Sequence, residues 1–192
     1  RDAQESRGLG DVYKRQILRL ADKGILVREE IAGRDAVYLR DMHDAEAYLA
    51  HMLSDMSERN YEYDFDVDSL LHGLFDDSEF PYSEKQKQAI AAAARNGLVI
   101  LTGGPGTGKT TTVSGILRVF EALSLNTLLA APTGRAAKRL SDLTGMEAKT
   151  IHRLLEVDFA NPTSLQFKRN EKNPLTADAV IVDETSICLL YT

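Results

Sequence analysis

The chain has 192 residues, 43% of them apolar, which is enough to bury a core in one large domain or two small ones. No stretch approaches the roughly 20 unbroken apolar residues of a membrane span. No basic-then-apolar leader opens the chain, so we expect neither export nor a membrane partner. The single cysteine, Cys188, excludes an intrachain disulfide and favours a reducing, cytoplasmic location.

The net charge of -6 is unevenly distributed along the chain. Residues 41–80 contain twelve acidic residues and one basic residue, Arg59, which leaves 17 acidic and 22 basic residues elsewhere. In 130–155 the basic residues are Arg135, Lys138, Arg139, Lys149 and Arg153, against Asp142 and Glu147. Such a surface suits a phosphate-bearing partner, and a solvated helix face is the alternative.

The first 82 residues predict a small unit followed by a connector. Residues 1–16 are polar and lack periodicity, so we expect them to be disordered or foreign to the fold. A helix from Ile17 to a stop at Gly24, then strands over 25–30 and 36–40 turning at Gly33, resembles the end of a winged-helix unit. A helix with one apolar stripe continues this unit to Met56, and the stripe predicts ordinary packing. The acidic segment 57–82 is typical of a connector.

From Ser83 onward, short apolar strands alternate with helices. We predict helices over 83–96, 109–123, 134–143 and 149–156, and strands over 98–102, 127–131 and 178–183. This alternation indicates an α/β fold with a parallel sheet covered by helices on both faces. Ligands of such sheets bind at the carboxyl ends of the strands.

A complete P-loop pattern lies between the first of these strands and the following helix. The stretch LTGGPGTGKTTT contains Gly103, four intervening residues, then Gly108, Lys109 and Thr110. Glycines let backbone amides converge on phosphate oxygens, and the start of the helix adds the positive end of its dipole. Lys109 is expected to reach the β- and γ-phosphates and Thr110 to coordinate Mg²⁺. The pattern predicts binding of a nucleoside triphosphate.

The apolar strand AVIV ends in Asp183 and Glu184. A carboxylate at this point is placed to hold Mg²⁺, usually through water, and the next carboxylate is placed to orient or deprotonate an attacking water. The predicted catalytic residues are therefore Lys109, Asp183 and Glu184, with Thr110 and Asp183 as ligands of Mg²⁺.

Two further segments have a structural as well as a functional interpretation. Ser83 and Gln86 have capping-box spacing, so capping of a helix alone would explain Gln86 and is the alternative to a functional role. Pro132 ends a strand, and Thr133 can cap the basic helix that carries Arg135.

Taken in order, SEKQKQAI, LTGGPGTGKTTT, AAPTGRAAKRL, TIHRLLE and VIVDETS resemble the RecD-like DNA helicases of superfamily 1, strongly over 83–187 and more weakly over 17–56. The resemblance implies an incomplete RecA-like P-loop domain over 83–187. It implies that Gln86 reads the adenine edge. The implied ATP-binding residues are Gln86, Gly103, Gly104, Pro105, Gly106, Thr107, Gly108, Lys109, Thr110 and Thr111. The implied DNA-binding residues are Pro132, Thr133, Gly134, Arg135, Lys138, Arg139, Thr150 and His152.

The family resemblance also implies a mechanism: an ATP- and Mg²⁺-dependent motor that moves 5′ to 3′ on single-stranded DNA and separates duplex DNA in repair and recombination. The chain departs from the family because it lacks a second RecA-like domain, and the tail over 188–192 and residues 1–16 look foreign to the fold. We therefore expect an internal fragment of a larger protein that does not unwind DNA alone. Two other classes stay open, namely another P-loop ATPase such as an AAA+ loader, and a non-catalytic winged-helix DNA-binding module.

Overall fold

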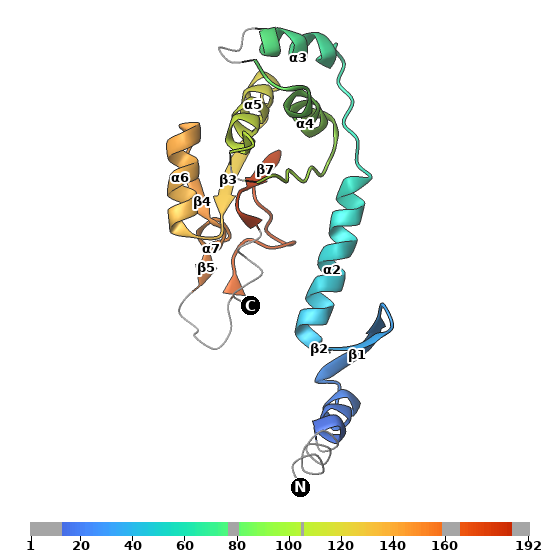
Figure 1. Ribbon diagram of the computed structural model, residues 1–192. Helices are drawn as coiled ribbons and strands as arrows, with labels where there is room; N and C mark the ends of the chain where they lie inside the picture. Colours follow the sequence, from blue (N-terminus) through green and yellow to red (C-terminus); the bar gives the residue numbers. More distant parts are fainter. Residues whose placement is uncertain (1–12, 77–80, 105, 159–165, 186–192) are drawn as a thin grey trace. The chain divides into compact units, whose positions relative to one another are not determined.

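The computed structural model describes residues 13–76, 81–104, 106–158 and 166–185 (Figure 1). The chain divides into two compact units, Arg1–Arg59 and Asn60–Thr192. No helix among the described residues is both long and apolar enough to cross a membrane.

The first unit is a helix, a β-hairpin and a long helix. The opening helix spans 13–22, so residues 13–16 are helical rather than disordered, while residues 1–12 lie outside the described part. Strands β1 (Leu26–Ile31) and β2 (Arg34–Leu39) pair antiparallel around a two-residue turn, which confirms the predicted hairpin. Helix α2 (Arg40–Ser57) follows at once.

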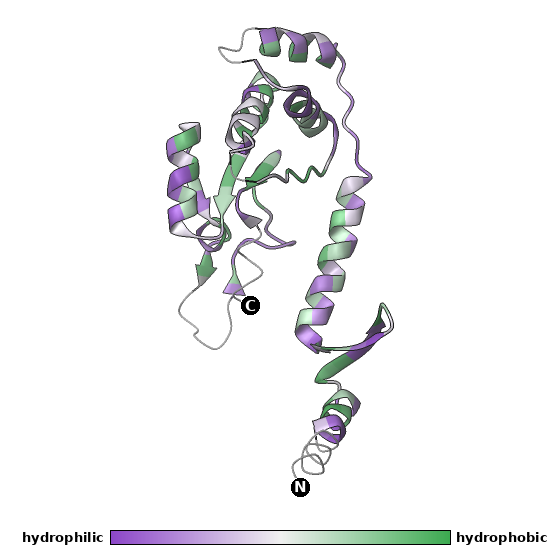
Figure 2. Cartoon of the chain, in the orientation of Figure 1, coloured by the Kyte–Doolittle hydropathy of each residue, from purple (hydrophilic) through white to green (hydrophobic). Residues whose placement is uncertain are grey.

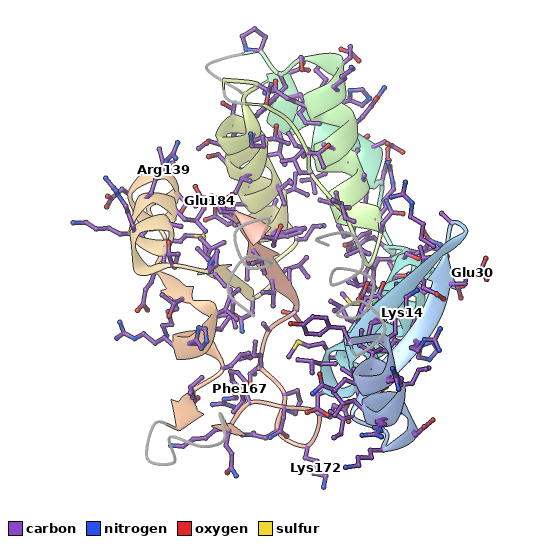
Figure 3. The ribbon with its side chains drawn as sticks, turned by 60° about the horizontal axis from the view of Figure 1, so that its bottom comes forward. Lys14, Glu30, Arg139, Phe167, Lys172 and Glu184 are labelled. Atoms are coloured by element: carbon purple, nitrogen blue, oxygen red, sulfur yellow. The ribbon has the colours of Figure 1, made fainter. Side chains whose placement is uncertain are left out.

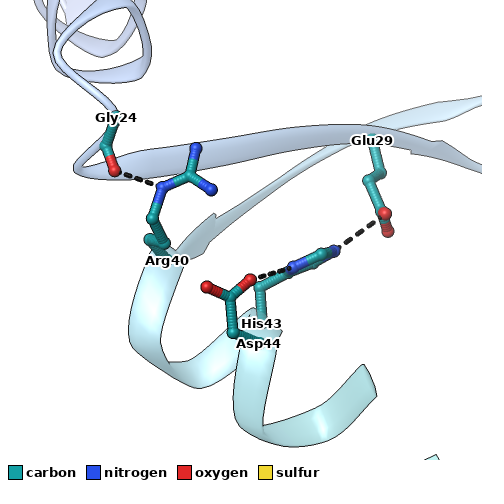
Figure 4. Close-up of polar contacts among 5 residues, drawn as sticks. All are labelled: Gly24, Glu29, Arg40, His43 and Asp44. Atoms are coloured by element: carbon teal, nitrogen blue, oxygen red, sulfur yellow. Dashed lines mark hydrogen bonds and ion pairs between the residues drawn. The ribbon is translucent and has the colours of Figure 1, made fainter. Parts of the chain in front are cut away.

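Polar contacts join the hairpin of the first unit to α2 (Figure 4). His43 on α2 lies 2.9 Å from the Glu29 carboxylate on β1 and 3.1 Å from that of Asp44, and both contacts raise the pKa of His43. Arg40 Nε donates to the carbonyl of Gly24, which follows the first helix. The apolar stripe of α2 packs only in part, since Met52, Leu53 and Met56 are half-buried while Tyr48 and Leu49 are exposed.

The second unit is built on a three-stranded parallel sheet in the order β4-β3-β7. Its strands are β3 (Thr127–Ala131), β4 (Ala148–Thr150) and β7 (Ala179–Val182). The helices are α3 (Val67–Asp76), α4 (Glu84–Arg95), α5 (Lys109–Ala122), α6 (Gly134–Thr144) and α7 (Ile151–Leu154). A separate antiparallel pair is formed by β5 (Val157–Asp158) and β6 (Gln166–Phe167). Helices flanking a parallel sheet confirm the predicted fold class.

The core of the second unit lies between the helices and the sheet. Figure 2 shows β3 and β7 as hydrophobic ribbons, in keeping with their sequences TLLAA and AVIV. Leu117 of α5, Leu129 of β3 and Leu140 of α6 are buried together, and Ile181 of β7 packs against them. A second cluster joins α3, α4 and α5 around Ile90, whose side chain is fully buried.

Helices α4 and α5 approach each other closely at Gly115. A Cβ atom there would lie 2.4 Å from Cδ1 of Ile90 and 3.2 Å from Cε1 of Tyr82. Glycine is therefore favoured by packing at this crossing, since a methyl group there would force Ile90 and Tyr82 to shift.

Hydrogen bonds join the loop before β3 to the loop before β7. Asn126 N donates to Asp178 Oδ2 at 2.8 Å, and its side chain donates to the carbonyl of Thr176 at 2.7 Å. In return, Asp178 N donates to the carbonyl of Asn126 at 2.8 Å. These bonds fix the start of β7 beside the start of β3, so the register Leu129↔Ile181 follows directly.

Three predicted elements differ from the structure. The described residues 98–104 form neither helix nor strand, and Ile100 is 75% exposed. A strand needs a neighbour that shares its hydrogen bonds, and no strand of the described sheets pairs with this segment. The predicted helix 149–156 is shorter, since residues 148–150 pair with β3 and α7 begins at Ile151. Part of the predicted connector is α3, whose Val67 and Leu71 are buried in the core.

Candidate nucleotide and nucleic-acid site

The P-loop ends in a left-handed turn at Gly108, which has φ +77° and is the N-cap of α5. Residues with a Cβ atom rarely adopt this conformation. Here a Cβ atom would also lie 2.5 Å from Nε2 of Gln86. The left-handed conformation therefore requires glycine at this position, and a Cβ atom would in addition displace the end of the Gln86 side chain. Pro105, which was also predicted to bind ATP, lies outside the described residues.

The ammonium group of Lys109 is held within the loop. Its Nζ donates to the carbonyl oxygens of Gly103 at 2.6 Å and Gly104 at 2.9 Å. Thr107 Oγ1 donates to the same Gly104 carbonyl at 2.9 Å. The cation therefore lies beside the loop backbone, where phosphate oxygens would compete with neutral carbonyls for its N–H groups.

Three threonines follow Lys109 and have different surroundings. Thr110 and Thr111 are exposed on the first turn of α5, whereas Thr112 is only 2% exposed. The Thr112 hydroxyl donates to the Gly108 carbonyl at 3.0 Å. Sequence analysis did not predict a role for Thr112, and its only sequence signal was its place one helical turn after Gly108.

Gln86 contacts both its own helix and the P-loop. Its Oε1 accepts from Ser83 N at 2.9 Å, while Ser83 Oγ accepts from Gln86 N at 3.4 Å, which confirms the capping box. Its Nε2 also donates to the Gly108 carbonyl at 3.3 Å. This second contact was not foreseen from the sequence.

Asp183 and Glu184 directly follow β7, as predicted. Asp183 N donates to the Ala130 carbonyl at 3.0 Å, which extends the pairing with β3 by one residue. Asp183 Oδ1 accepts from Glu184 N at 2.9 Å, and Glu184 has φ +54°. A glutamate in the left-handed region is strained, and strained residues of this kind concentrate at functional sites.

Glu184 is paired with a basic residue of α6 (Figure 3). Arg139 Nη1 lies 3.8 Å from Glu184 Oε1, with the side chains 70% and 34% exposed. An exposed pair at this distance contributes at most about 1 kcal/mol. It nevertheless joins a residue predicted to bind DNA to one predicted to handle the attacking water.

The residues predicted to hold Mg²⁺ have suitable donor chemistry. Thr110 offers a hydroxyl and Asp183 a carboxylate, and Mg²⁺ prefers such hard oxygen ligands together with phosphate oxygens and water. Asp183 is half-buried, and one of its oxygens accepts a backbone N–H, which orients the carboxylate.

The predicted DNA-binding residues follow two neighbouring strands. Thr133 comes after β3 and caps α6, its Oγ1 accepting from Ala136 N at 3.2 Å. Thr150 ends β4 and caps α7, its Oγ1 accepting from Arg153 N at 3.2 Å. The predicted capping by Thr133 is thereby confirmed. The residues Gly134, Arg135, Lys138 and Arg139 are exposed on α6, and Pro132 is half-buried before it.

His152 lies on the exposed side of α7 rather than in the core. Its ring centroid is 6.3 Å from that of Phe167 on β6, which is 37% exposed. Two partly exposed rings beside a basic segment form a surface on which a base can stack.

The parallel sheet brings these groups to one edge. Asp183, Thr133 and Thr150 follow three neighbouring strands that run in the same direction, so all three lie at their carboxyl ends. Helix α5 ends at Ala122, only a short turn before β3 begins, and it packs on β3 through Leu117. It therefore runs back along the sheet, and its first turn faces the same edge.

The sequence of this chain matches one family model and is similar to several known proteins. A family model described as an AAA domain matches residues 86–191, more than half of the chain. The ATP-dependent RecD2 DNA helicase of Deinococcus radiodurans is 45% identical over 105 residues, which cover 55% of this chain and 14% of that protein.

Two RecBCD enzyme subunits named RecD are also similar. The protein of Mycolicibacterium smegmatis is 41% identical over 130 residues, covering 56% of this chain and 23% of that subunit. The protein of Haemophilus influenzae is 33% identical over 164 residues, covering 73% of this chain and 25% of that subunit. The chain thus spans a quarter or less of the length of these relatives. It belongs to the AAA domain family, and over the matched segment it is RecD-like.

Proposed function

We propose that this chain forms the nucleotide-binding part of an ATP-dependent DNA helicase. The observation that supports the proposal is the carboxyl edge of the sheet, where Asp183, Glu184 and the basic helix α6 follow neighbouring parallel strands and Arg139 pairs with Glu184. Residues 83–187 would form part of a RecA-like motor and 17–56 a winged-helix-like unit. Similarity to RecD-like helicases supports this assignment.

Each residue predicted to form the ATP site has a proposed role in ATP binding or hydrolysis. The glycine-rich loop from Gly103 binds the phosphates, and Lys109 exchanges loop carbonyls for the β- and γ-phosphate oxygens. Thr110 and Asp183 hold Mg²⁺, which when bound neutralises phosphate charge. Glu184 orients the attacking water and accepts its proton. Gln86 reads the adenine edge.

The basic helix α6 and the start of α7 are proposed to contact single-stranded DNA. Exposed Arg135, Lys138 and Arg139 supply positive charge for a sugar-phosphate backbone. His152 with Phe167 supplies a stacking surface. Movement from 5′ to 3′, separation of duplex DNA, and a cytoplasmic role in repair and recombination rest on the family resemblance alone.

The first experiment measures binding of Mg-ATP to the 192-residue chain by calorimetry. Lys109→Ala should weaken binding by at least ten-fold, because a charge-assisted contact to phosphate is worth roughly 1.5–3 kcal/mol. Lys172→Ala is the matched control, since this exposed lysine lies far along the sequence from the P-loop. Equal affinity of wild type and the Lys109 variant would refute the assigned site.

A second experiment addresses DNA. The ATPase rate of a protein that includes this chain and the rest of its parent should rise when single-stranded DNA is added, and Glu184→Gln should remove that rate while leaving ATP binding intact. A DNA-independent rate would contradict the helicase assignment and favour another P-loop ATPase.

A further inference from the structure

The carbonyl oxygen of Gly108 is an unusually crowded point of the P-loop. It accepts from Thr112 N at 3.0 Å, from Thr112 Oγ1 at 3.0 Å and from Gln86 Nε2 at 3.3 Å. A carbonyl has two lone pairs, so three donors hold this oxygen from more than one direction. Two of these donors belong to α5 itself, and the third comes from α4.

The orientation of the Gly108 carbonyl fixes the backbone that follows it. Gly108 is the left-handed N-cap of α5, and the amides of Lys109 and Thr110 come directly after it. Those amides belong to the unpaired N–H groups at the start of a helix, which bind anions. The Lys109 N–H belongs to the same peptide group as the Gly108 carbonyl, so rotation of that group would turn this N–H away from a phosphate.

Gln86 is firmly anchored on its own helix. The capping box ties its side chain to Ser83. One helical turn later on α4, Ile90 is fully buried against α5, with Gly115 as the point of close approach. The helix that carries Gln86 is therefore packed against the helix whose first turn it contacts.

We propose that Gln86 is a positioning residue that fixes the C-terminal end of the P-loop for phosphate binding, through its hydrogen bond to the Gly108 carbonyl and independently of any base. This inference rests on the proposed nucleotide site and adds a second role to the residue. The amide of Gln86 has two N–H groups and two lone pairs on its oxygen. The contact with Ser83 uses one lone pair and the contact with Gly108 uses one N–H group. One lone pair and one N–H group therefore stay free to bind adenine.

The two roles are separated by a ligand that has phosphates and no base. We would measure the affinity of the 192-residue chain for inorganic triphosphate with Mg²⁺, and for Mg-ATP, by calorimetry. Gln86→Met keeps the length of the side chain and removes both polar groups. It should weaken triphosphate binding roughly five-fold, the effect of one hydrogen bond.

Two control variants make the result specific. Gln88→Ala changes an exposed glutamine on the same helix and should leave both affinities unchanged. Ser83→Ala removes the hydroxyl of the capping box but leaves the bond between Gln86 and Gly108, so it should lower the melting temperature without lowering triphosphate affinity. Far-UV circular dichroism establishes that each variant is folded.

The outcomes distinguish this inference from the function on which it rests. If Gln86→Met weakens ATP binding and leaves triphosphate binding unchanged, Gln86 reads only the base and the inference is wrong. If Ser83→Ala weakens triphosphate as strongly as Gln86→Met, the effect is helix capping, which also overturns it. If the wild-type chain binds neither ligand, the proposed nucleotide site itself fails.

Discussion

The close approach of α4 and α5 predicts the effect of adding one methyl group. Gly115→Ala improves helix propensity by about 1 kcal/mol. Against this gain, the new Cβ atom would lie 2.4 Å from Cδ1 and 3.1 Å from Cγ1 of Ile90, a side chain with no exposed surface. Overpacking of this kind costs about 1–3 kcal/mol. Subtracting the gain in helix propensity from this cost leaves a net loss of up to about 2 kcal/mol, and because Ile90 has no solvent to move into, we expect a loss near the upper end of this range.

Urea unfolding followed by circular dichroism measures this loss for the second unit, and a double-mutant cycle tests its cause. Ile90→Val removes the Cδ1 atom and should cost about 0.5–1.5 kcal/mol alone. On that background, Gly115→Ala should cost clearly less than it does in the wild type. Gly73→Ala in α3 is the control, because no atom lies within 4 Å of its Cβ position, and it should be neutral or stabilising. Additive costs, or a stabilised Gly115 variant, would refute the steric argument.

Three further predictions follow from individual contacts. Thr112→Val should lower the free energy of unfolding by about 0.5–1.5 kcal/mol, and an unchanged urea midpoint would contradict this. Hydrogen bonds to Glu29 and, to a smaller extent, to Asp44 raise the pKa of His43. The stability that protonated His43 gives the first unit should therefore be complete below pH 6.5 and be lost as the pH rises through the raised pKa. Thermal melts at several pH values should show this loss, and His43→Gln should abolish it. Arg139→Ala should change stability by less than about 0.5 kcal/mol. It should also reduce the salt dependence of DNA binding by about one unit of slope, and an unchanged slope would exclude a phosphate contact.

The sequence predicted the parts of the second unit that depend on local signals. Strand 127–131 has the predicted bounds, and the capping box at Ser83 forms because its two residues are only three positions apart. The P-loop pattern placed α5 to within a residue, since Gly108 and Lys109 mark a helix start by their own conformational preferences. Local chemistry was sufficient in each case.

Features that depend on distant partners were not predictable in the same way. Residues 98–102 have the apolar composition of a strand, but a strand exists only where a neighbour accepts its hydrogen bonds. Lys149 and Thr150 were included in the predicted helix 149–156, yet they belong to β4 and pair with β3. The contact of Gln86 with Gly108 spans 22 positions, and no spacing rule indicates it.

The hydrogen bonds between Asn126 and Asp178 also affect how the chain folds. Asn126 and Asp178 are 52 positions apart, so their hydrogen bonds close a long loop beside the point where β7 pairs with β3. The entropy of closing a loop grows only with the logarithm of its length, and a doubling costs about 0.6 kcal/mol. Lengthening the intervening chain should thus alter stability little, while non-local pairing of this kind is slow to form. The two carboxylates after β7 are therefore expected to reach their positions late in folding.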